Sequence, residues 1–152
     1  MAHQEIERKF LVHREKLPIP LPKGEEFEQA YLGLSPTVRV RIVDRQTAYM
    51  TVKGAGLLSR EEIEFEIPLG DAKAMVKLSP YKVVHKTRHN IPYAGCVWEV
   101  DLYHGELDGL LTAEVEMESE DQAVELPDFV GREVTEDPAY KNSSLAQRGV
   151  PG

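Results

Sequence analysis

Alternation between charged and apolar residues constrains the fold of this chain more than any other feature. Successive side chains of a strand point to opposite faces, so in the segment EIERKF the residues Glu5, Glu7 and Lys9 share one face. The same period of two recurs along most of the chain and predicts eight strands. They are expected at residues 4–12, 26–34, 37–43, 46–54, 60–68, 82–90, 96–104 and 112–119. Eight mostly antiparallel strands predict a mainly β (α+β) fold, an eight-stranded antiparallel β-barrel with a few helices packed outside.

Three short helices are expected between or after the strands. Asp71 is a candidate N-cap for a helix through AKAMVKL. Ser119 and Gln122 resemble a capping box ahead of AVEL and predict a second helix. A third helix is expected to begin with Pro138 at its first position and to end near Gly149.

The composition indicates one soluble globular domain. The 152 residues are 41% apolar and 29% charged, and we expect a single domain over residues 1–152. The chain lacks a run of about 18 apolar residues, so no membrane span is expected, and MAHQEIERKF is unlike a secretory signal. The single cysteine, Cys96, excludes an internal disulfide and a thiolate metal cage, and the cytoplasm is the expected compartment. A net charge of −8 without a Lys/Arg run argues against a nucleic-acid partner.

The charged faces of the strands differ in sign from strand to strand. An open sheet with one solvated face would also alternate, but a solubilising surface mixes both signs. Like charges side by side on an open sheet would repel one another for no gain. The pattern therefore favours a charged barrel interior. Basic faces carry Arg39 and Arg41, Lys53, and Lys86 and Arg88, whereas acidic faces carry Glu62, Glu64 and Glu66, Glu99 and Asp101, and Glu114, Glu116 and Glu118.

Enclosed charges of this number need partners. Buried ionised groups must be paired with each other, bound to metal or bound to ligand. Carboxylates without nitrogen or sulfur ligands select hard cations, here Mg²⁺ or Mn²⁺. Arg and Lys at several heights suit the oxygens of a phosphate chain. The interior therefore predicts a metal ion and a phosphate chain as joint ligands.

The Glu5-x-Glu7-x-Lys9 segment carries a resemblance to a known family. With the later charged residues, it resembles the CYTH superfamily, the triphosphate tunnel metalloenzymes, and in particular their short bacterial branch. The resemblance covers about residues 3–148, and the tail EVTEDPAYKNSSLA fits it too. The other matching positions are Arg39 and Arg41, Lys53, Arg60 with Glu62 and Glu64, Lys86 and Arg88, Asp101, and Glu114 with Glu116.

The resemblance implies a role for each charged set. Metal binding is expected from Glu5, Glu7 and Glu116 with Glu114 close by, while Glu62, Glu64 and Asp101 would help or hold a second metal or a water. Phosphate binding is expected from Lys9, Arg39, Arg41, Lys53, Lys86 and Arg88. The residues expected to act in catalysis are Lys9, Tyr31, Arg41 and Lys86.

Tyr31 has two interpretations. It falls on the same face as Gln29 and Gly33, so its ring is expected to point inward. With Lys9 nearby, its phenolate would be favoured and could orient or activate water. Alternatively, it is a buried tyrosine that only packs or forms a hydrogen bond.

The expected activity is hydrolysis of a linear triphosphate, first of all inorganic tripolyphosphate to pyrophosphate and phosphate. Thiamine triphosphate or a nucleoside triphosphate is the alternative substrate. Adenylate cyclisation and non-catalytic polyphosphate binding are less favoured, since the short chain leaves little room for an adenine site and anion binding alone needs no carboxylates. The apolar outer face is expected to contact helices or a second copy, so a homodimer is possible.

Overall fold

The computed structural model describes residues 2–151. None of the helices in this range is long and apolar enough to cross a membrane. The strands are β1 (Ala2–Val12), β2 (Gly24–Leu34), β3 (Thr37–Val43), β4 (Thr47–Lys53), β5 (Ser59–Ile67), β6 (Val84–Tyr93), β7 (Cys96–Tyr103), β8 (Leu111–Glu116) and β9 (Val130–Glu133). The helices are α1 (Leu69–Leu78) and α2 (Asn142–Arg148), with 3₁₀ turns η1 (Arg14–Lys16), η2 (Gly105–Leu107) and η3 (Pro138–Tyr140).

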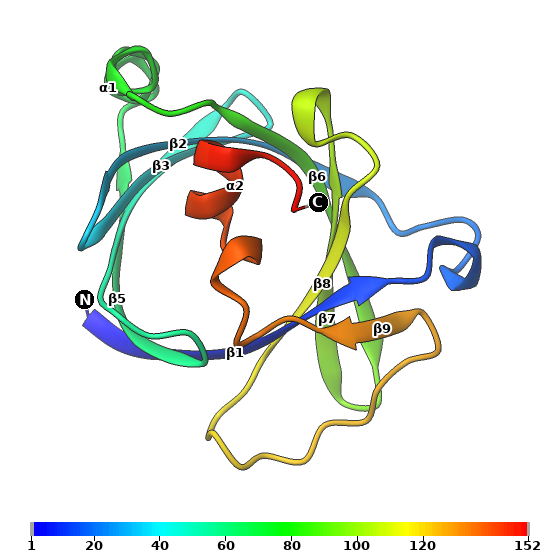
Figure 1. The fold of residues 1–152 in the computed structure, drawn as a ribbon. Helices are drawn as coiled ribbons and strands as arrows, with labels where there is room; N and C mark the ends of the chain where they lie inside the picture. Colours follow the sequence, from blue (N-terminus) through cyan, green and yellow to red (C-terminus); the bar gives the residue numbers. More distant parts are fainter. Residues whose placement is uncertain (1, 152) are drawn as a thin grey trace.

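The first eight strands form a closed antiparallel barrel, as the alternation predicts. They follow the order β5-β4-β3-β2-β6-β7-β8-β1, and a β5–β1 pairing closes the ring (Figure 1). β1 is therefore the closing strand: its first half pairs with β5 and its second half with β8. The short β9 adds to β1 from outside this ring and was not expected from the sequence.

The outer faces of the strands are apolar and largely covered. Helix α1 packs against β2, β3 and β4 (Figure 1), and its Ala72 lies in a buried cluster with Val40 and Ile42. On the opposite part of the barrel, Trp98 is fully buried in a cluster with Phe10. These clusters stabilise the barrel by removing apolar surface from water.

Helix α2 occupies a different position from the one expected. It lies across one opening of the ring rather than on the outer wall (Figure 1). Its Leu145 is buried in a cluster with inward-facing residues such as Tyr31, Val84 and Tyr103. Of the two helices, only α1 packs outside, and α2 fills one end of the barrel with apolar side chains.

The predicted helix boundaries need three corrections. Asp71 does not cap α1, because this helix begins at Leu69 after Pro68 and has no side-chain cap. The segment from Ser119 to Gln122 forms a turn and no helix, since the Ser119 hydroxyl bonds Asp121 instead of a helical N–H. The third predicted helix is split into η3 and α2. Gly149 ends α2, as expected, with a φ of 78°.

Candidate functional site

The inward faces of the strands line a polar cavity of about 190 Å³ inside the barrel. It brings together most of the residues predicted for the site, from seven strands. These are Glu5, Glu7, Lys9, Tyr31, Arg39, Arg41, Lys53, Glu62, Glu64, Arg88, Glu114 and Glu116. The two predicted residues outside the lining are Lys86 and Asp101.

Carboxylates from β1 and β8 form one wall of the cavity. The strand pairing places Glu7 opposite Glu116 and Lys9 opposite Glu114. Burial raises the pKa of Glu7 well above its ordinary value, and the charges of Glu114 and Glu5 raise it further. Burial alone would raise the pKa of Glu114. The pKa is nevertheless well below its ordinary value, because Glu7 forms a hydrogen bond with this carboxylate and the charges of Lys9 and nearby cations stabilise it. The opposite pKa shifts of these neighbouring carboxyl groups favour the neutral form of Glu7 and the charged form of Glu114.

Cations from β4 and β5 meet the first carboxylate of β1. Lys53 Nζ donates to Glu5 Oε1 at 2.9 Å and lies 3.3 Å from Glu62 Oε2. Arg60 Nε lies 3.6 Å from Glu5 Oε1. Burial raises the pKa of Glu5, but Lys53 and a hydrogen bond from Glu62 outweigh it, so the pKa is lowered. Glu5 is thus ionised and already has cationic partners.

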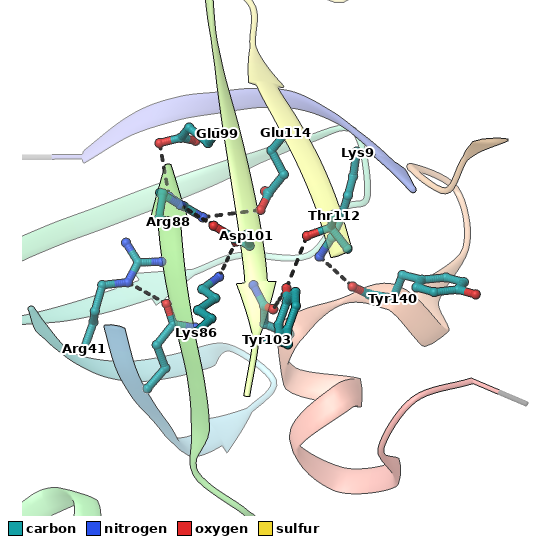
Figure 2. A network of polar contacts seen from close by, with 12 residues as sticks. Lys9, Arg41, Lys86, Arg88, Glu99, Asp101, Tyr103, Thr112, Glu114 and Tyr140 are labelled. Carbon is teal, nitrogen blue, oxygen red and sulfur yellow. Dashed lines mark hydrogen bonds and ion pairs between the residues drawn. The ribbon is translucent and has the colours of Figure 1, made fainter. Parts of the chain in front are cut away.

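A second ion-pair network lies on β6 and β7, next to the wall formed by β1 and β8. Arg88 donates to both carboxylate oxygens of Asp101, at 2.8 and 3.0 Å, and approaches Glu99 and Glu114 at 3.1 and 3.4 Å (Figure 2). Lys86 Nζ donates to Asp101 Oδ2 at 2.7 Å, and neither side chain is exposed. Burial lowers the pKa of Lys86 to about 7, although Asp101 raises it. Lys86 and Asp101 therefore support Arg88 from behind the cavity surface.

Two further cations are held mainly by neutral groups. Lys9 Nζ donates to the backbone carbonyl oxygen of Tyr140 at 2.6 Å (Figure 2). Arg41 Nε donates to the side-chain oxygen of Gln29 at 2.6 Å. Within residues 2–151, neither cation has a carboxylate within ion-pair distance. Both positive charges remain available to an anion.

Arg39 also has capacity for a ligand. Its Nη2 donates to the Thr51 hydroxyl at 3.0 Å and lies 3.4 Å from Glu64 Oε2. Its Nε is buried and has no acceptor in the part of the chain that the structure describes. A buried donor without an acceptor is costly, so this atom suits an anionic oxygen entering the cavity.

Tyr31 lines the cavity, on the inward face where it was expected. Its hydroxyl lies 3.4 Å from the Gln29 side-chain nitrogen. Burial raises the pKa of Tyr31, although Arg39, Arg41 and Arg60 oppose the shift. Lys9 was expected to favour the phenolate, whereas burial shifts the pKa of Tyr31 in the direction that favours the neutral phenol.

The cavity also includes residues that the prediction of the site omitted. Arg60 matches the family pattern but was given no role. Lys141, Asn142 and Ser143 come from the start of α2 and line the cavity where this helix crosses the barrel end. Burial, Arg60 and Lys53 lower the pKa of Lys141. Alternation on the strands could not reveal Lys141, Asn142 and Ser143, because these three residues lie outside the strands.

The carboxylate oxygens of the cavity are suitable ligands for a hard divalent cation. Such oxygens are the ligands that Mg²⁺ and Mn²⁺ prefer. Burial and the negative charges of Glu114 and Glu5 raise the pKa of Glu7, so positive charge beside these carboxylates is favourable. Among residues 2–151, no three His, Cys, Asp or Glu side chains already form a metal-binding group. To bind the cation, Glu5 would have to give up its ion pair with Lys53.

Comparison with known proteins places this architecture in a family. Residues 3–150 match the CYTH domain, and the chain belongs to this family. It is 40% identical to an inorganic triphosphatase of Acetivibrio thermocellus, covering 95% of this chain and 94% of that protein. It is 39% identical to an inorganic triphosphatase of Nitrosomonas europaea, covering 93% and 96%. The crystal structure of the inorganic triphosphatase NE1496 superposes with a TM-score of 0.70 at 34% identity over 97% of both chains.

Proposed function

We propose that this chain hydrolyses inorganic tripolyphosphate to pyrophosphate and phosphate with the help of Mg²⁺ or Mn²⁺. The observation that carries the proposal is the cavity itself, in which cations and carboxylates from different strands surround one enclosed space. The two relatives named inorganic triphosphatase match nearly the whole length of the chain and support the same activity.

The carboxylates are proposed to hold the metal. Glu5, Glu7 and Glu116 would bind it directly, with Glu114 close by, and Glu62 and Glu64 would assist at the neighbouring strand. When bound, the metal would supply Lewis-acid stabilisation to the phosphate oxygens. Glu7 would lose its proton on binding, since a cation and a proton compete for the same carboxylate.

The cations are proposed to hold the phosphate chain and to offset charge on the transferring group. Lys9, Arg39, Arg41, Lys53 and Arg88 approach the cavity from different strands, so they could contact a chain of phosphates at several points. Phosphoryl transfer depends mainly on such positioning and charge stabilisation. Lys86 and Asp101 would act through Arg88.

Tyr31 is proposed to orient the attacking water as a neutral hydrogen-bonding group. Tyr31 lines the cavity, and its hydroxyl lies 3.4 Å from the Gln29 side-chain nitrogen. Because burial raises its pKa, the role of a resident phenolate base is not part of the proposal. A water held beside the terminal phosphorus would need orientation more than a strong base, since the transition state is loose.

The cavity favours an inorganic substrate over an organic one. Its described lining is dominated by charged side chains, whereas small-molecule sites for organic groups are mostly apolar. Thiamine triphosphate and nucleoside triphosphates remain the alternatives to be tested.

The decisive experiment compares turnover of tripolyphosphate, thiamine triphosphate and ATP, each with Mg²⁺ and with Mn²⁺. We expect the highest kcat/KM for tripolyphosphate. A higher kcat/KM for either organic substrate would overturn the inorganic assignment, and no turnover of any of the three would overturn the proposed reaction.

A further inference from the structure

Arg41 differs from most cations of the cavity wall in what holds it. Lys53, Arg39 and Arg88 each have a carboxylate oxygen within 3.4 Å. The Arg41 guanidinium has none within ion-pair distance among residues 2–151. Arg41 is thus a largely enclosed cation whose neighbours do not neutralise it.

Two neutral side chains of β2 fix the Arg41 guanidinium. Gln29 lies opposite Arg41 in the strand pairing, is fully buried, and accepts from Arg41 Nε at 2.6 Å. Phe27, two residues earlier on the same inner face, places its ring centroid 4.3 Å from Arg41 Cζ. A ring face attracts a cation without removing its charge, and an amide oxygen does the same through one hydrogen bond.

The surroundings make this positive charge costly without an anion. Burial lowers the pKa of Arg41 to about 9, and the positive charges of Arg39 and Arg88 contribute. The Arg88 guanidinium also lies over the Phe27 ring, 5.0 Å from its centroid, so two like charges contact the same ring. A glutamate at position 29 would accept from the same N–H and would also compensate the charge of Arg41. The amide therefore leaves a positive charge that a carboxylate of nearly equal shape would pair.

We propose that Gln29 and Phe27 are positioning residues that hold Arg41 rigidly while leaving its charge uncompensated, so that Arg41 becomes the subsite with the strongest demand for a phosphate. This inference rests on the proposed function, because it takes the cavity ligand to be a phosphate chain. It adds that phosphate binding requires an uncharged side chain at position 29. A hydrogen-bond acceptor that carries a negative charge would not be sufficient.

Gln29→Glu separates neutrality from shape, because it keeps the acceptor at Arg41 and adds a negative charge. We expect a higher melting temperature without ligand and weaker binding of metal-free tripolyphosphate by about 10- to 100-fold, the usual range for losing one hydrogen bond to a charged group. A purely structural Gln29 would instead shift melting temperature and affinity in the same direction, or neither. Gln46→Glu, on an exposed turn, is the matched control and should change neither.

Phe27→Leu gives an independent test that does not introduce a buried charge. It keeps apolar bulk and removes the ring face, so affinity for tripolyphosphate should fall by roughly 3- to 30-fold, as expected for one lost cation–π contact. Both affinities are measured by titration calorimetry in EDTA. If wild type binds tripolyphosphate and either variant binds equally well, the inference fails. If wild type itself does not bind it without metal, the inference also fails, and turnover with Mg²⁺ or Mn²⁺ tests the proposed function separately.

Discussion

Two ion pairs of this protein have the same length and opposite surroundings. Outside the barrel, Arg8 Nη2 lies 2.7 Å from Glu133 Oε1, and the two side chains are 26% and 39% exposed. Inside, Lys86 Nζ lies 2.7 Å from Asp101 Oδ2, and both side chains are 0% exposed. Solvent and salt screen the outer pair, whereas the inner pair has neither and depends on its partners.

The difference shows that distance alone does not determine what an ion pair contributes. An exposed pair gains little, because water solvates each charge nearly as well when the partner is lost. A buried pair leaves an uncompensated charge when one partner is removed. We therefore expect changes on the inner wall to have large effects and changes on the outer wall to have small ones.

The largest expected effect is loss of turnover on metal removal. Excess EDTA should abolish hydrolysis of tripolyphosphate, and Mg²⁺ or Mn²⁺ should restore it, because only the inner carboxylates are proposed to need a cation. Phosphate release reports the result. Full activity in EDTA would remove the metal roles of Glu5, Glu7 and Glu116.

Asp101→Asn should be the most destabilising substitution of an ion-pair residue. It leaves Lys86 and Arg88 buried without their main counter-charge, and such a loss costs about 3–5 kcal/mol. Denaturant titration of wild type and variant measures the difference in unfolding free energy. A loss as small as that of an exposed pair would show that the inner network is solvated.

Glu116→Gln keeps the shape of an inner side chain and removes one proposed metal ligand. Turnover should fall by about 10²–10³-fold, in the range found when one stabilising group of a transition state is lost. The unfolding free energy should change little, because Glu116 is exposed at the end of β8. Kinetics within a factor of about three of wild type, less than 1 kcal/mol in the barrier, would contradict the assignment.

Tripolyphosphate should stabilise the folded chain by bringing negative charge to the inner cations. A ligand that binds only the folded state contributes about 2.7 kcal/mol at a hundredfold excess over its Kd. Thermal melts at equal ionic strength should show a much larger shift with tripolyphosphate than with monophosphate, since only a chain reaches several strands at once. Equal shifts would indicate a nonspecific effect on exposed charges.

The smallest effect is expected for Glu133→Gln on the outer wall. The exposed pair with Arg8 should contribute less than about 1 kcal/mol, and added salt should remove it. A hydrogen bond from Arg8 lowers the pKa of Glu133, so the contribution is present at neutral pH and is lost as the pH falls through that pKa. Melts at two salt concentrations test this, and a salt-independent loss of several kcal/mol would contradict the comparison.

The sequence was most informative where one strand face carried charge. Alternation around Glu5 and Glu7 predicted both the barrel and an inward set of carboxylates, because a closed sheet must place one face inside. It could not reveal β9, whose four residues are too few to show a period. It also missed Lys141, since this residue reaches the cavity from a turn before α2.

Charge states were harder to predict than positions. Tyr31 was correctly placed inward, but its pKa depends on the balance between burial and three arginines from other strands. Spacing along the chain cannot give that balance, because it depends on distances across the barrel. The error at Ser119 has a different, local cause, because its hydroxyl donates to Asp121 and a capping motif does not anticipate this partner.

The position of β1 as the closing strand has a consequence for how the chain reaches its folded state. β1 pairs with β8, far along the chain, as well as with β5. Contacts of such large sequence separation form slowly, because the intervening segment must be ordered first. Glu7 and Glu116 are therefore brought together only when the ring closes. A partly folded chain would therefore lack the carboxylate arrangement that the proposed cation site needs.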